Sequence, residues 1–202
     1  HSHPLVNLPG AFVAAQGFHG AEPFDAEALL TRYTAARFGT ALPAFADALR
    51  LAEVRVPWCQ SLEMTPPASA PRAVRTWLDA VEAQPGGRAG LIADVESAAA
   101  DLARADALFR ALRAQARTHA RDVDYWGEGV AHTAFCAAFS LALLRDRLPQ
   151  DAAALTAQLH ARRDETRRLF AATFPPASVE GELAIRYAFH EAVLESAGIR
   201  RP

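Results

Sequence analysis

Apolar residues recur at steps of three and four along most of the chain, which is the spacing of one face of an α-helix. No segment shows the period-two alternation that is typical of a half-buried strand. The pattern predicts helices over residues 26–38, 43–54, 72–83, 91–119, 122–148, 151–172 and 178–197. Because most of the connections between these segments are short, neighbouring helices are expected to be antiparallel.

Residues that commonly begin or end helices mark the predicted boundaries. Asp25 is expected to cap the first helix and Gly39 to end it. Asp122 or Asp124 is expected to cap the fifth helix, which would run to Leu148 and stop at Pro149. Ser178 is expected to cap the last helix.

The predicted fold is all-α: a single-domain bundle of six or seven mostly antiparallel helices over residues 25–202. Its length of 202 residues, with 51% hydrophobic and 22% charged residues, suits one domain with a real core. Residues 1–24 are rich in Pro and Gly and begin without Met, so they are expected to form an irregular lead-in or a tag remnant.

Charge and hydropathy argue against nucleic acid and membranes as partners of this chain. The net charge of −2 argues against a nucleic-acid surface, which would need a basic excess. No apolar run is long enough to cross a bilayer and no signal peptide stands at the start, so a cytoplasmic protein without membrane contact is expected. Two cysteines, Cys59 and Cys136, are too few for a disulfide framework.

The segment 122–128, Asp-Val-Asp-Tyr-Trp-Gly-Glu, places carboxylates beside two aromatic rings. Such a combination can bind a sugar, because rings stack on apolar sugar faces and carboxylates accept hydrogen bonds from hydroxyls. It is also typical of the first turn of a helix, where the helix dipole favours acids. Of the two interpretations, the helix start is favoured.

Histidines on the long helices raise the question of a metal. Glu128, His132 and Cys136 follow at i, i+4 and i+8 and therefore share one helix face, while His160 and His190 lie on later helices. The chain lacks the Glu-x-x-His pair of di-iron bundles and the His-Glu-x-x-His motif of zinc proteases. We therefore expect neither a metal site nor a cofactor. A third possibility is an enzyme built wholly within the bundle, with Glu128 and His132 as its acid and base. Only the spacing of these two residues supports it.

The stretch from 106–109 (Asp-Ala-Leu-Phe) through 125–128 (Tyr-Trp-Gly-Glu) to Leu144 resembles the helical domain that follows the catalytic barrel in bacterial β-N-acetylhexosaminidase-like glycoside hydrolases. In that family a segment Leu-Trp-x-x-Arg-Asn-Arg-Pro precedes the final helix. The comparable segment here is 168–176, in which Phe170 stands in place of the Trp.

The resemblance implies a non-catalytic appendage. The family's catalytic Asp-Glu pair belongs to the barrel, so no catalytic residue is carried over to this chain. Residues 5–25 would be the exit from the barrel. The implied partners are a catalytic barrel domain or a carbohydrate, and a homo-oligomer is an open alternative.

The leading functional hypothesis is therefore an accessory helical domain of a glycoside-hydrolase-like protein. Its candidate ligand-binding residues are Trp58, Tyr125, Trp126, Glu128 and His132, of which the first four are expected to be partly exposed near one end. The alternative is a free-standing helical protein that binds a ligand or a metal, such as a sensor. Its apolar pocket inside the bundle would be lined by Trp77, His132, Phe135 and Phe139.

Overall fold

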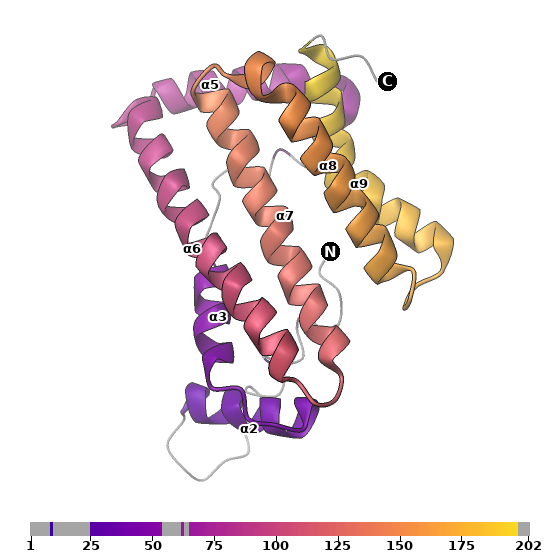
Figure 1. The fold of residues 1–202 in the computed structure, drawn as a ribbon. Coiled ribbons are helices and arrows are strands. Elements are labelled where there is room, and N and C mark those ends of the chain that lie inside the picture. Colours follow the sequence, from indigo (N-terminus) through magenta and orange to yellow (C-terminus); the bar gives the residue numbers. More distant parts are fainter. Residues whose placement is uncertain (1–8, 10–24, 54–61, 63–64, 198–202) are drawn as a thin grey trace. The chain divides into compact units, whose positions relative to one another are not determined.

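The computed structural model describes residues 9, 25–53, 62 and 65–197 of the chain. Over these ranges the protein is all-α, as predicted, and contains no strand (Figure 1). The helices are α2 (Ala26–Phe38), α3 (Ala44–Ala52), the short 3-10 helix η2 (Pro67–Ser69), α5 (Ala70–Glu82), α6 (Gly87–Gln115), α7 (Ala120–Leu144), α8 (Leu148–Phe170) and α9 (Pro176–Ser196). Apart from Pro9, the predicted lead-in lies outside the described residues.

The boundaries of α2 are as predicted. The Asp25 carboxylate accepts a hydrogen bond of 3.0 Å from the backbone N–H of Ala28, which otherwise has no partner in the first turn. Gly39 follows the helix with φ +69°, the left-handed conformation that a glycine adopts without steric cost.

Several other predicted boundaries are wrong: helix α6, for example, runs over Gly87–Gln115 rather than 91–119. Three of the errors concern residues that were expected to cap or end a helix. Helix α7 begins at Ala120, ahead of both predicted caps, Asp122 and Asp124. It ends at Leu144, and Pro149 lies instead in the first turn of α8. Helix α9 begins at Pro176 rather than after Ser178. For α8 and α9 the physical reason is that a proline fits the first turn of a helix, where its missing N–H has no intrahelical acceptor to lose.

The chain divides into two compact units. Unit 1 contains His1–Val54 and Asp101–Val130, and unit 2 contains Arg55–Ala100 and Ala131–Pro202. Each unit is therefore assembled from two separate stretches of sequence, and helices α6 and α7 contribute residues to both.

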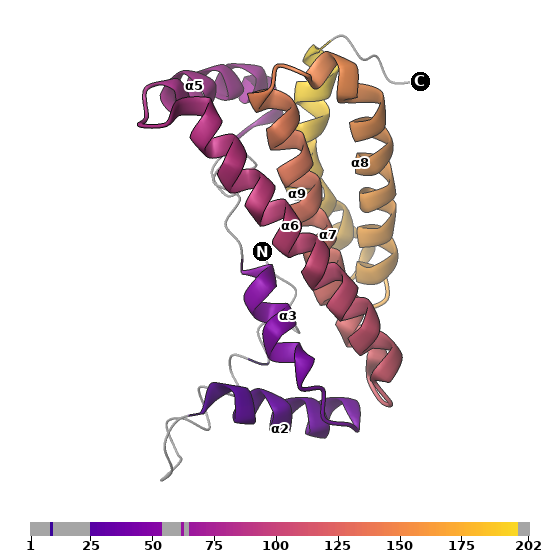
Figure 2. The same cartoon turned by 60° about the vertical axis from the view of Figure 1, so that its left-hand side comes forward.

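Unit 1 has an aromatic core. Helices α2 and α3 pack together (Figure 2), and their rings meet side chains of α6 and α7. Phe45 lies edge-on to Trp126 at 5.2 Å and to Phe109 at 6.3 Å between ring centroids. Phe38 and Tyr33 extend the cluster. Edge-to-face pairs of this kind stabilise a core beyond the area that they bury.

The turn after α2 is tied to the turn between α6 and α7. The carbonyl oxygen of Phe38 accepts hydrogen bonds from the backbone N–H groups of Arg117 (2.9 Å) and Thr118 (3.0 Å). The Thr118 hydroxyl donates to the carbonyl oxygen of Arg37 at 2.9 Å. These bonds satisfy carbonyl groups that the end of a helix leaves without partners.

Unit 2 is built around α9. Helices α8 and α9 lie side by side (Figure 1), and α9 also packs against α5 and η2. Within this core the hydroxyl groups of Thr166 and Tyr187 form a hydrogen bond of 2.8 Å, so that both are buried with a partner.

Helix α7 is apolar over most of its length. By length and composition alone it could cross a membrane, with a mean hydropathy of 1.3 over its most apolar window. However, 56% of that window is buried inside the protein, as is usual for the core helix of a bundle.

Candidate functional site

The acid–aromatic residues predicted near one end of the bundle lie inside unit 1. Tyr125, Trp126 and Glu128 are 4%, 5% and 4% exposed, so the expectation that they are partly exposed is wrong. Trp58, the fourth residue of that prediction, lies outside the described residues. The Trp126 ring packs against Phe38 and Phe45, in the aromatic core of unit 1.

The charged residues of this segment are engaged in ion pairs. Asp122 accepts hydrogen bonds from Arg37, the shortest at 2.6 Å, and Asp124 accepts one of 3.0 Å from Arg113. Burial raises the pKa of the neighbouring Tyr33 hydroxyl, an effect that the positive charge of Arg37 partly offsets. The two aspartates therefore tie α7 to α2 and α6.

His132 belongs to a different cluster, in unit 2. The Sγ atom of Cys136 lies 3.7 Å from Nε2 of His132 and 3.9 Å from Nε2 of His190. We call His132, Cys136 and His190 the thiol–imidazole cluster. Cys136 is 1% exposed and His190 is fully buried, whereas His132 is only half-buried.

Aromatic rings surround the thiol–imidazole cluster. The rings of Phe135, Phe139 and Phe189 lie 5.0, 4.9 and 5.5 Å from that of His190, and Tyr187 lies edge-on to His132 at 5.3 Å. Phe135 and Phe139, predicted to line an apolar pocket, thus pack on His190. Trp77, predicted beside them, lies half-buried on α5.

Sequence spacing predicts only part of the thiol–imidazole cluster. It placed His132 and Cys136 on one face of a helix, but His190 follows 54 residues after Cys136 and joins them only through the packing of α9. Tyr187 was not predicted. The available signal was the inward face of α9, whose buried members Leu183, Tyr187, His190 and Leu194 follow at steps of four, three and four.

The cluster is not a preformed three-ligand metal centre. Among the described residues no group of three His, Cys, Asp or Glu side chains is arranged to hold a metal ion. The centroids of the His132 and His190 rings lie 6.5 Å apart. What the arrangement offers is a buried thiol with two nitrogen bases within reach of its proton.

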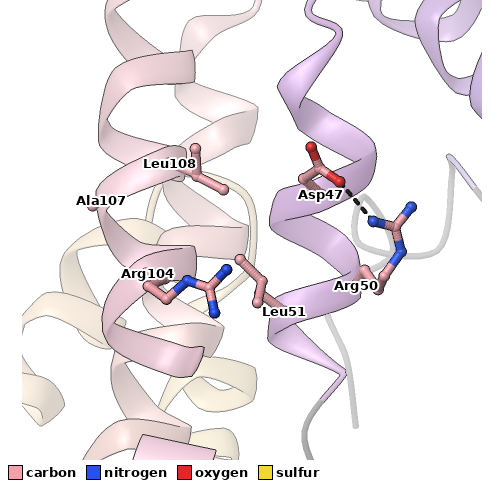
Figure 3. Close-up of a pocket in the computed structure, with 6 residues that line it drawn as sticks. All are labelled: Asp47, Arg50, Leu51, Arg104, Ala107 and Leu108. Atoms are coloured by element: carbon pink, nitrogen blue, oxygen red, sulfur yellow. Dashed lines mark hydrogen bonds and ion pairs between the residues drawn. The ribbon is translucent and has the colours of Figure 1, made fainter. Parts of the chain in front are cut away.

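Unit 1 also carries a surface groove between α3 and α6, with a volume of about 660 Å³ (Figure 3). Its apolar floor comes from Leu51, Ala107 and Leu108, and Asp47, Arg50 and Arg104 stand around it. Arg50 forms ion pairs with Asp47 (2.6 Å) and with Glu27 (2.7 Å). The dashed line in Figure 3 marks the pair with Asp47. Asp101 holds Arg104 at 3.1 Å. The two guanidinium groups are thus already neutralised by the chain's own carboxylates.

The chain matches no protein-family model, no curated protein and no solved structure.

Proposed function

We propose that this chain is a non-catalytic helical accessory domain of a larger glycoside-hydrolase-like protein, in which it packs against and supports a catalytic barrel. The observation that carries the proposal is the burial of Tyr125, Trp126 and Glu128. These are the side chains best suited to stacking on a sugar or to acid–base chemistry, and here they lie in the core of unit 1.

The carboxylates of the same segment support this proposal. Glycoside hydrolysis needs two carboxyl groups that flank the substrate bond, one of them able to donate a proton. Asp122 and Asp124 accept hydrogen bonds from Arg37 and Arg113. These carboxylates join α7 to α2 and α6.

The test is an assay of the purified chain on aryl N-acetylglucosaminides, together with sequencing of the coding DNA upstream of Leu5. We expect no turnover, and an upstream frame that encodes alternating strands and helices. Turnover that is abolished by Glu128→Gln, in protein with an unchanged circular dichroism spectrum, would overturn the proposal. A stop codon just upstream of Leu5 would do so as well.

A second candidate function, a free-standing helical protein that binds a ligand or metal, is favoured by one observation. This is the approach of the Cys136 sulfur to two imidazole rings, at 3.7 Å from Nε2 of His132 and 3.9 Å from Nε2 of His190. Purified protein that holds stoichiometric metal, lost in His132→Ala, would support it. Protein that takes up no metal and no small molecule would contradict it.

A further inference from the structure

We draw no further inference here: the strongest candidate, the surface groove between α3 and α6 with its apolar floor of Leu51, Ala107 and Leu108, carries none because nothing in the described part of the chain shows what covers it, and the guanidinium groups of Arg50 and Arg104 beside it already pair with carboxylates of the same chain.

Discussion

At the scale of single residues, Trp126 shows how a side chain suited to ligand binding serves as core. Its ring contacts those of Phe38 and Phe45, and it is 5% exposed. Its indole N–H is buried and has no hydrogen-bond partner among the described residues. The ring therefore stabilises the folded protein through packing, and its N–H group adds little to that stability.

Replacement of Trp126 by Ala should lower the free energy of unfolding by about 3–5 kcal/mol, because it leaves a large hole between α2, α3 and α7. Trp126→Phe, which keeps a ring and removes the N–H, should cost clearly less. Urea denaturation followed by circular dichroism measures both. A loss below about 1 kcal/mol in Trp126→Ala would show that the ring is not a core residue.

The pair Arg37–Asp122 joins α2 to α7 at 2.6 Å, with 30% and 12% of the two side chains exposed. A double-mutant cycle with Arg37→Ala and Asp122→Asn should give a coupling energy of about 1–2 kcal/mol, as for hydrogen bonds between charged groups. The exposed pair Arg110–Asp106 is a control and should couple by less than about 0.5 kcal/mol. Equal coupling in the two pairs would contradict the partial burial of the first.

At the scale of elements, two glycines should respond to substitution in opposite directions. Gly39 has φ +69°, and an added Cβ would lie 3.3 Å from the Thr118 hydroxyl oxygen. Gly39→Ala should therefore destabilise the protein by about 1–2 kcal/mol. Gly181 lies within α9 with nothing within 4 Å of an added Cβ, so Gly181→Ala should stabilise it by up to about 1 kcal/mol. Thermal unfolding of both variants checks the signs, and two changes of the same sign would be inconsistent with these conformations.

Helix α8 carries an ion pair that should make stability depend on acid pH. The hydrogen bond from Arg168 lowers the pKa of the Glu165 carboxyl below its ordinary value of 4.5. The pair therefore stabilises the folded state at pH values above the unfolded pKa, and this contribution is lost as pH falls through the lower folded pKa. Glu165→Gln should cost less than about 1 kcal/mol at pH 7, since 59% of the Arg168 side chain and 34% of that of Glu165 are exposed, and nothing near pH 2. A cost that grows as pH falls would contradict the pairing.

At the scale of the whole molecule, each compact unit is discontinuous in sequence. A fragment of residues 101–202 would keep Phe109 and Trp126 but lose Phe38 and Phe45, the rings against which they pack. It should remain helical yet lack fixed near-ultraviolet circular dichroism and bind the dye ANS. The full chain is the control and should bind little dye; a fragment with native near-ultraviolet signals would contradict this account of unit 1.

Much of the architecture could be predicted from the sequence alone. Apolar spacing gave the all-α class and the order of the helices, because the period of a helix is a local property of the chain. Asp25 and Gly39 fixed both ends of α2 for the same reason: a cap acts within one turn. The boundaries at Pro149 and Pro176 could not be assigned in this way, since a proline ends one helix and begins another equally well.

Only the tertiary structure decided which side chains are exposed and which distant ones meet. Tyr125, Trp126 and Glu128 have the composition of a binding surface, but all three are buried. The Trp126 ring packs on Phe38 of α2 and Phe45 of α3, which lie far away in the sequence. His190 reaches Cys136 across 54 residues because α9 packs in unit 2. Periodicity tells which residues share a face of one helix, and it contains no information about which helix covers that face.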